Sequence, residues 1–324
     1  MKTLVILLIL FSGIEGKASP EALAKKEIQE VLHSLRSSDS LRQFNQSSRN
    51  FETLSQSSFT QEFQCKILDD FKEEDLILLE EWTENLPCSL KISEKIENYW
   101  SAQPIPLILS RNTGKPTLEK VVNPDSGPIY SRGELQKKQI AITFDDGPHR
   151  RRTPKILDIL SDFQVRATFF NVGENIRRYP DLSLQAANDG HSVGTHTDTH
   201  PRVIKLPFKD AQFEILNAHE SALLATGSDT HFFRFPYGEK NKQIQNWVRE
   251  QKFATFFWNM DSLDWKITKV DALYENVIKE IEKFKGGIIL FHDIHEQTVR
   301  VLPRVLQYLE DNEFETVVFV PSLN

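Results

Sequence analysis

The chain has 324 residues and a formal net charge of −7. This length is enough for one large domain and a smaller one, and the mixture of charges is that of an ordinary soluble protein. A nucleic acid or an acidic membrane surface would require a basic chain or a basic patch. The charge balance therefore favours neither as a partner.

The N-terminal stretch MKTLVILLILFSGIEGKASP has the features of an export signal. Lys2 supplies a positive charge, Leu4 to Phe11 form an apolar run, and Gly16-Lys17-Ala18 is a small-x-small site. A run of about ten apolar residues is too short to cross a bilayer of about 30 Å. Residues 1–18 therefore predict a cleaved signal peptide and a periplasmic or secreted protein without a transmembrane segment. The alternative is a retained N-terminal anchor.

Export makes the two cysteines, Cys65 and Cys88, interpretable. In an oxidising compartment, with no other thiol in the chain, we expect them to form a disulfide. The loop-entropy model assigns about 3 kcal/mol to such a bridge. The alternative is a pair of unpaired buried thiols.

Residues 19–100 have a polar, helical pattern and predict a helical accessory region. Residues 101–137 concentrate proline and glycine turn signals, and we interpret them as a linker. The accessory region carries no grouping that suggests chemistry. Its apolar positions form two helical faces, Ile28, Val31, Leu32 and Leu35 in one and Ile92, Ile96 and Tyr99 in the other.

From residue 138 onward, short apolar runs alternate about seven times with amphipathic helical windows. Helices are expected at 154–163, 208–226 and 270–284. Such alternation predicts an α/β fold with a parallel sheet, closed or nearly closed into a β/α barrel. In such barrels the functional groups lie at the C-terminal ends of the strands. The expected strands are QIAITF, RATFF, HSVGTH, HFFRFP, FATFFWNM, GGIILFH and ETVVFV.

Reactive side chains do follow these strands. They are Asp145-Asp146 after the first strand, His196 after the third, Arg234 after the fourth, Asp261 to Asp264 after the fifth and His292-Asp293 after the sixth.

The motif HTDTH contains His196 and His200. On a strand, residues four apart would be separated by about 13 Å. On a helical turn they approach to about 6 Å, within reach of one metal ion. We therefore expect the strand to break into a turn here, with two surface or packed histidines as the alternative.

A third, anionic ligand would complete a site of two histidines and one carboxylate. Asp145 and Asp146 both qualify. Adjacent residues point in different directions, so one should bind the metal while the other acts as a base. The plainer reading of DDGP is a polar turn that caps the following helix.

His292 ends the apolar run IILFH. A lone histidine there is commonly a structural hydrogen-bonding group. A carboxylate such as Asp264 would raise its pKa and keep it protonated, ready to donate a proton. Arg234 could lower the pKa of a carboxylate and orient it.

These motifs closely resemble those of the polysaccharide deacetylase family, also called the NodB-homology domain or carbohydrate esterase family 4. The resemblance spans about residues 138–322, and we take 138–324 as this domain. The fold that it implies is a distorted (β/α)7-type barrel. Five motifs occur in order: TFDDGP at 143–148, HTDTH at 196–200, RFPY at 234–237, DSLDW at 261–265 and LFH at 290–292.

The resemblance implies a role for each matching residue. Asp145 would be the general base and His292 the general acid, oriented by Arg234 and Asp264 respectively. The backbone N–H of Tyr237 would donate to the oxyanion. The implied metal ligands are Asp146, His196 and His200, and the implied walls of the acetyl pocket are Trp265 and Leu290.

The implied activity is metal-dependent removal of N-acetyl groups from N-acetylglucosamine in a cell-wall glycan, with zinc as the expected ion and cobalt or another divalent cation as alternatives. Export points to peptidoglycan first, with chitin or chitooligosaccharide next. Ester removal from xylan is a weaker third. A catalytically silent glycan-binding module and a cell-wall scaffold are alternatives of another class. We expect a monomer.

Overall fold

The computed structural model describes residues 116–132 and 134–322, together with residues 25–26, 28–29, 32–33, 68, 71–78 and 88–101 of the N-terminal region. The chain divides into two compact units, Met1–Ile105 and Pro106–Asn324. The signal peptide predicted at 1–18 lies outside the described residues. No helix in the described part of the chain is long and apolar enough to cross a membrane.

The described part of the first unit is helical, with α5 at Glu73–Leu78 and α7 at Ser89–Ser101. Ile92 and Ile96 of α7 are buried, so the apolar face predicted for this helix is a packing face. Lys95 donates from Nζ to the carbonyl of Phe71 at 2.7 Å. Cys65 lies outside the described residues, and its disulfide with Cys88 stays a prediction.

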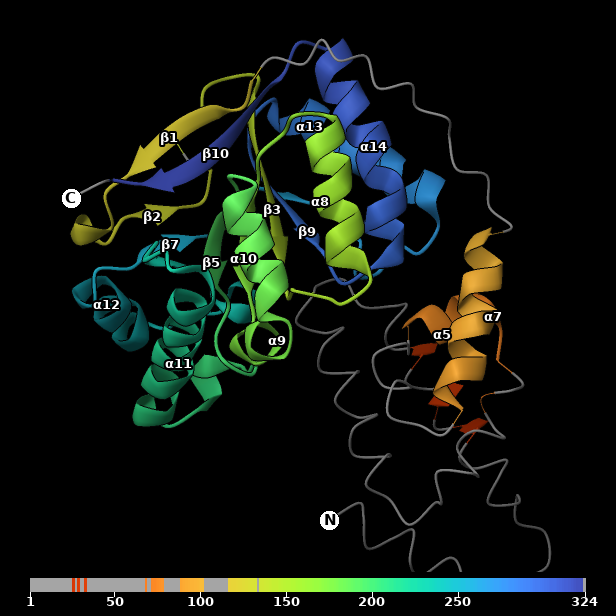
Figure 1. Ribbon diagram of the computed structural model, residues 1–324, viewed down its shortest axis with the longest axis horizontal. Helices are drawn as coiled ribbons and strands as arrows, with labels where there is room; N and C mark the ends of the chain where they lie inside the picture. Colours follow the sequence, from red (N-terminus) through yellow and green to blue (C-terminus); the bar gives the residue numbers. More distant parts are fainter. Residues whose placement is uncertain are drawn as a thin grey trace, which may run out of the picture. The chain divides into compact units, whose positions relative to one another are not determined.

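The second unit alternates strands with helices and short 3-10 turns (Figure 1). Its strands are β1 Leu118–Val122, β2 Ile129–Tyr130, β3 Gln139–Asp145, β4 Thr168–Asn171, β5 Ser192–Thr195, β6 Phe232–Phe233, β7 Ala254–Phe256, β8 Met260–Asp261, β9 Gly287–His292 and β10 Glu315–Pro321. Its helices are α8 Arg152–Asp162, α9 Gly173–Arg178, α10 Pro180–Asn188, α11 Phe208–Thr226, α12 Lys242–Glu250, α13 Val270–Phe284 and α14 Glu296–Asp311, with 3-10 turns η1 Pro124–Ser126, η2 Val203–Lys205 and η3 Pro236–Gly238.

The strands form one ten-stranded sheet in which every neighbouring pair is parallel. Strand β9 pairs with β3 along Ile140–Asp145, whereas β10 and β4 share the opposite edge of β3. From β3 the sheet continues through β4, β5, β6 and β7, and on the other side through β9 to β8. No ladder joins β7 to β8 among the described strands. The predicted α/β fold with a parallel sheet is thus confirmed as a distorted barrel, which is not closed between β8 and the edge of the sheet where β2 pairs with β7.

The linker predicted at 101–137 is shorter than expected. Within it, β1 pairs with β10 and β2 pairs with β7, so both belong to the second unit. The sequence concealed them because each strand is short and lies next to the proline and glycine residues of η1 and its flanking turns.

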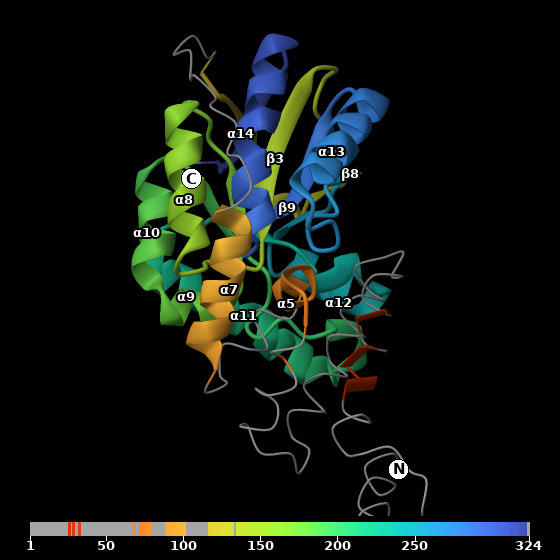
Figure 2. The same cartoon turned by 90° about the vertical axis from the view of Figure 1, so that its right-hand side faces the viewer.

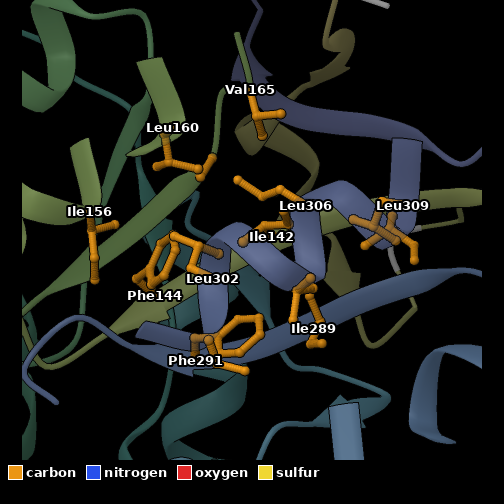
Figure 3. Close-up of a cluster of buried hydrophobic side chains, with 14 of the residues drawn as sticks. Ile142, Phe144, Ile156, Leu160, Val165, Ile289, Phe291, Leu302, Leu306 and Leu309 are labelled. Atoms are coloured by element: carbon orange, nitrogen blue, oxygen red, sulfur yellow. The ribbon is translucent and has the colours of Figure 1, made fainter. Parts of the chain in front are cut away.

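Side chains along β3 alternate between a face that packs against helices and a face that carries reactive groups. Ile140, Ile142 and Phe144 belong to a buried cluster that also includes side chains of α8, α13, β9 and α14. Figure 3 shows Ile142 and Phe144 among the side chains of α8, β9 and α14. Helices α8, α13 and α14 cover the outer side of β3, β8 and β9 (Figure 2). Successive strand residues point to opposite faces, so Thr143 and Asp145 face the barrel interior. Packing on one face therefore fixes the direction of the reactive side chain on the other.

A second buried cluster fills the base of the interior. Its members come from β1, β2, β3, β4, β6, β7, β9 and β10 and from Leu135, and include Phe170, Phe232, Phe256 and Phe319. Several of these rings stack or tilt on one another, with Phe256 and Phe319 centroids 4.9 Å apart. These aromatic side chains are therefore core residues.

Candidate active and metal site

The two carboxylates of TFDDGP diverge because their backbone conformations differ. Asp145 is the last residue of β3, with the extended conformation of the strand, whereas Asp146 has a left-handed φ of 73°. Asn175 of α9 holds the turn by donating from Nδ2 to the backbone carbonyl of Asp146 at 2.8 Å. Because of this turn, the Asp146 carboxylate does not follow the alternating side-chain directions of β3 and points toward the HTDTH segment.

Asp146 meets His196 and His200, as the third-ligand argument requires. Its Oδ1 lies 3.6 Å from Nε2 of His196 and 3.3 Å from Nε2 of His200. The ligand atoms of the three residues lie within 4.8 Å of one another. Oδ1 of Asp146 is also a buried oxygen with no hydrogen-bond partner. A buried carboxylate oxygen in this position is suited to a cation, which would satisfy it.

Hydrogen bonds on the far side of each imidazole prepare both rings for metal binding. Nδ1 of His196 lies 2.8 Å from the carbonyl of Arg234, which can only accept, so this nitrogen carries the proton. Tyr237 lies with its hydroxyl 3.1 Å from both Nδ1 and the carbonyl of His200. In the arrangement that satisfies both contacts, Nδ1–H donates to the phenol and the phenol donates to the carbonyl. Each Nε2 then presents a lone pair toward Asp146, as a metal ligand must.

The HTDTH segment brings its histidines together, but not on a helical turn. The rings of His196 and His200 are 4.9 Å apart, yet the segment is an irregular loop in which Thr197 and His200 have φ values of 67° and 58°. The prediction of proximity is confirmed and that of a helical turn is wrong. Residues with positive φ interrupt helical winding, and spacing alone does not reveal them.

Residues outside the motifs hold this loop, and sequence reasoning missed them. Arg177 of α9 donates to Oδ1 of Asp198 at 2.5 Å. Glu214 of α11 accepts from the backbone N–H groups of Asp198 and Thr199 at 3.0 and 2.8 Å. The available signal was the carboxylate of Asp198 inside HTDTH, because a buried carboxylate requires a partner.

The other carboxylate, Asp145, is paired with Arg234. Nη1 of Arg234 donates to Oδ1 of Asp145 at 2.7 Å and to Thr143 at 2.8 Å. Both members of the pair are buried. Burial raises the pKa of Asp145 to about 7, although the guanidinium acts in the opposite direction. A base with a pKa near neutrality is well matched to taking a proton from water.

Beside this pair, His292 on the neighbouring strand β9 forms a second buried dyad with Asp264. Nδ1 of His292 lies 2.7 Å from Oδ1 of Asp264. Burial opposes the protonation of His292, but the carboxylate of Asp264 outweighs it and raises the pKa of His292 to about 10. The ring nitrogen Nε2 lies 3.9 Å from Oδ2 of Asp146, beside the three ligand-type side chains. An imidazolium here can donate a proton at the same centre.

The remaining predicted residues lie in the same strand ends. Tyr237 has a left-handed φ of 60° in η3, immediately after Arg234-Phe235-Pro236. Trp265 follows Asp264 and is buried, and Leu290 precedes His292 by two residues on β9 and is also buried. Their roles as oxyanion donor and pocket walls stay predictions.

Asp293 is a further buried carboxylate at this centre that sequence reasoning left without a role. Its Oδ2 accepts from Thr153 at 2.5 Å, and its backbone N–H points to the carbonyl of Asp145 at 3.4 Å. Burial raises the pKa of Asp293 to about 7. Asp293 follows His292 directly, so its position in the chain was the only signal.

A chitooligosaccharide deacetylase of Azorhizobium caulinodans is 34% identical over 159 residues, which cover 48% of this chain and 74% of that relative. Residues 132–256 match the polysaccharide deacetylase family. The chain belongs to this family. The matched segment contains the motifs from TFDDGP to RFPY and ends before Asp264 and His292.

Among the relatives, a peptidoglycan-N-acetylglucosamine deacetylase of Bacillus cereus is 38% identical over 160 residues, which cover 49% of this chain and 58% of that relative. The chain thus covers little more than half of the length of the Bacillus cereus relative. A solved structure of a Bdellovibrio bacteriovorus peptidoglycan deacetylase has a TM-score of 0.81 at 24% identity and covers 94% of this chain and 96% of its own, which shows the shared fold. A Bacillus anthracis structure described as a carbohydrate esterase family 4 pseudoenzyme, at 22% identity, has a TM-score of 0.56, with 61% of this chain and 74% of that one covered.

Proposed function

We propose that this polysaccharide deacetylase hydrolyses the N-acetyl group of N-acetylglucosamine residues in a cell-wall glycan, with peptidoglycan as the leading substrate. The observation that carries the proposal is the meeting of Asp146, His196 and His200 between two buried dyads, Asp145–Arg234 and His292–Asp264. A silent glycan-binding module would have no use for a paired base and acid beside a metal triad.

The metal triad suits a divalent cation, with zinc as the first expectation. Asp146, His196 and His200 would hold the ion, which when bound would polarise the acetyl carbonyl and lower the pKa of the attacking water. Burial favours the neutral form of Asp146, but His200, His292 and His196 outweigh it and lower its pKa to about 2. Burial lowers the pKa of His196 to about 3. Both residues are therefore in their ligating protonation states at neutral pH.

The chain's own residues divide the proton transfers. Asp145 accepts a proton from the water that attacks the amide carbon, and Arg234 keeps the carboxylate aimed at the centre. The tetrahedral oxyanion would be stabilised by the backbone N–H of Tyr237, a kind of donor typically worth about 3 kcal/mol of barrier. His292 gives its proton to the departing nitrogen. The C–N bond breaks, and acetate and a free amine on the sugar result.

Peptidoglycan is favoured by the activity of the Bacillus cereus relative, a peptidoglycan-N-acetylglucosamine deacetylase, and by the signal-like N-terminus. We propose on the latter ground that the protein acts in the periplasm or outside the cell. Sequencing the N-terminus of the protein recovered from the producing cells would test removal of residues 1–18.

A second candidate substrate is a chitooligosaccharide. It is supported by the 34% identity to the Azorhizobium enzyme, of which the chain covers the larger part.

The deciding experiment incubates the zinc-loaded full chain with chitooligosaccharides and with purified peptidoglycan fragments, followed by mass spectrometry. Each deacetylation replaces one acetyl group with hydrogen, so the fragment spectrum reports both the substrate and the position. Asp145→Asn should abolish acetate release while zinc remains bound, whereas Asp146→Asn should lose the ion held with His196 and His200, which elemental analysis would record as one zinc fewer per chain. Glycan binding without acetate release from either substrate would favour the silent module instead.

A further inference from the structure

A second group of ligand-type side chains lies at the opposite end of β6 from the catalytic centre. His231 directly precedes β6, whereas Arg234 directly follows it. His219 is on α11, and Asp229 lies in the short connection from α11 to β6. The second group therefore lies at the end of this strand that faces away from Arg234 and the catalytic centre.

The three side chains converge on a single oxygen. Nε2 of His219 is 3.2 Å and Nδ1 of His231 is 2.6 Å from Oδ1 of Asp229. All three ligand atoms lie within 4.8 Å of one another. We propose that His219, Asp229 and His231 form a second binding site for a divalent transition-metal ion such as Zn²⁺.

Packing holds the two imidazoles in place. Their ring centroids are 4.4 Å apart, and the buried ring of Phe253 lies 5.0 Å from His219 and 4.9 Å from His231. The backbone of His231 is fixed as well, because its carbonyl accepts from Ala254 at 2.9 Å. His231 has a left-handed φ of 50°, which costs conformational energy in a residue other than glycine. The sheet thus holds this side chain in an uncommon backbone geometry, facing α11.

The distances suit a small ion with only a local adjustment. With zinc–ligand bonds of about 2.0–2.1 Å, the ligand atoms of a tetrahedral site lie roughly 3.3 Å apart. The His219–Asp229 separation of 3.2 Å already fits, and the His231–Asp229 separation of 2.6 Å must widen. The side chain of Asp229 is 53% exposed, so its carboxylate is the member of the group that can turn. That exposure also leaves the remaining coordination positions accessible to water.

The consequence is a cross-link between α11 and the start of β6. The same helix carries Glu214, which holds the backbone of the HTDTH loop. An ion at His219 would therefore brace the helix that positions the catalytic ligands, with no part in the chemistry itself.

The test uses the full chain with the catalytic ligands removed by Asp146→Asn and His200→Gln, and titrates it with Zn²⁺ and with Co²⁺ by calorimetry and visible absorption. We expect one ion per chain and a cobalt spectrum typical of nitrogen and oxygen ligands. Adding His231→Gln or Asp229→Asn should weaken binding at least tenfold. Asp158→Asn, a matched change at an exposed aspartate, should leave it unchanged. Circular dichroism establishes that each variant is folded, and Asp229→Asn should keep the fold because this side chain is 53% exposed.

In the otherwise unaltered chain, His231→Gln should reduce the bound zinc from two ions to one while acetate release at saturating zinc is retained. Absence of binding in the Asp146→Asn, His200→Gln chain would overturn the proposal, as would binding that both His231→Gln and Asp229→Asn leave unaffected. None of these measurements needs a glycan, so they stand even if the proposed deacetylase activity fails.

Discussion

Asp264 holds His292 by both its ring and its main chain: Oδ1 is 2.7 Å from Nδ1 of the imidazole, and Oδ2 accepts from the backbone N–H at 2.7 Å. Thr298 of α14 donates to the same Oδ2 at 2.6 Å. A buried carboxylate that accepts three hydrogen bonds stays ionised and fixes its partner's orientation. The dyad is therefore one preorganised unit, built where β9 meets the segment that follows β8.

Replacing Asp264 with asparagine should move the alkaline limit of activity to lower pH. The raised pKa of His292, about 10, depends on the Asp264 carboxylate. Without it, burial is opposed only by the weaker attraction of Asp146 and Asp145, so the pKa of His292 falls and the general acid is lost at a lower pH. The measurement is kcat/KM for acetate release as a function of pH. Thr298→Val, which keeps the carboxylate, should cause a much smaller shift, and an unmoved alkaline limit in Asp264→Asn would remove His292 from the acid role.

Arg234→Met should destabilise the fold as well as abolish activity. The change leaves the Asp145 carboxylate buried without its ion-pair partner, and it removes the contact from Nη2 to the carbonyl of Phe257, 3.2 Å in length. Breaking one side of a buried pair typically costs about 3–5 kcal/mol of unfolding free energy. Urea denaturation measures the loss.

The double variant Arg234→Met, Asp145→Asn is the control, because it removes both charges. It should recover part of the stability and none of the activity. Equal stability of the single and double variants would show that the pair is not what sustains this part of the core.

Gly147→Ala should impair both metal binding and catalysis. A Cβ at this position would overlap both carboxylate oxygens of the buried Asp293. Asp293 cannot withdraw freely, since it is held by Thr153 at 2.5 Å. The turn that presents Asp146 must therefore shift instead. We expect a lower zinc affinity by calorimetry and reduced acetate release. Adding Asp293→Ala removes the overlapping oxygens and should restore part of both. If neither recovers in the double variant, the overlap with Asp293 is not the cause of the loss.

The elements with strong local patterns were predictable from the sequence. The windows 208–226 and 270–284 coincide with α11 and α13, and the run QIAITF lies within β3. In each of these segments the apolar residues recur at the spacing of a helix or a strand often enough to predict that structure. The run FATFFWNM instead divides into β7 and β8, because a strand break within an apolar run leaves no periodic signal.

The site was predictable as a set of residues but not as a geometry. Strand order placed Asp146 near His196, because parallel strands end at one edge of a barrel. The left-handed residue Asp146 and the contact of Tyr237 with His200 were not predictable, since they depend on backbone conformation and on tertiary packing. Arg177 and Glu214 were missed for the same reason: their partners are distant in the sequence.

His191 should make the fold sensitive to mild acid. The backbone N–H of Ala167 donates to Nδ1 of this ring at 3.0 Å, so the nitrogen must be unprotonated. Burial lowers the pKa of His191 to about 4, from an ordinary value of 6.5. The folded pKa lies below the unfolded one, so the contribution of the neutral ring is complete above about pH 6.5 and is lost as the pH falls toward 4. Over this window the loss of unfolding free energy should be about 2–3 kcal/mol.

Urea unfolding at pH 7 and pH 4.5 measures this loss. His191→Gln, which does not titrate, should show a pH-dependent loss smaller by that amount. An identical loss in the variant would assign the acid sensitivity to other groups.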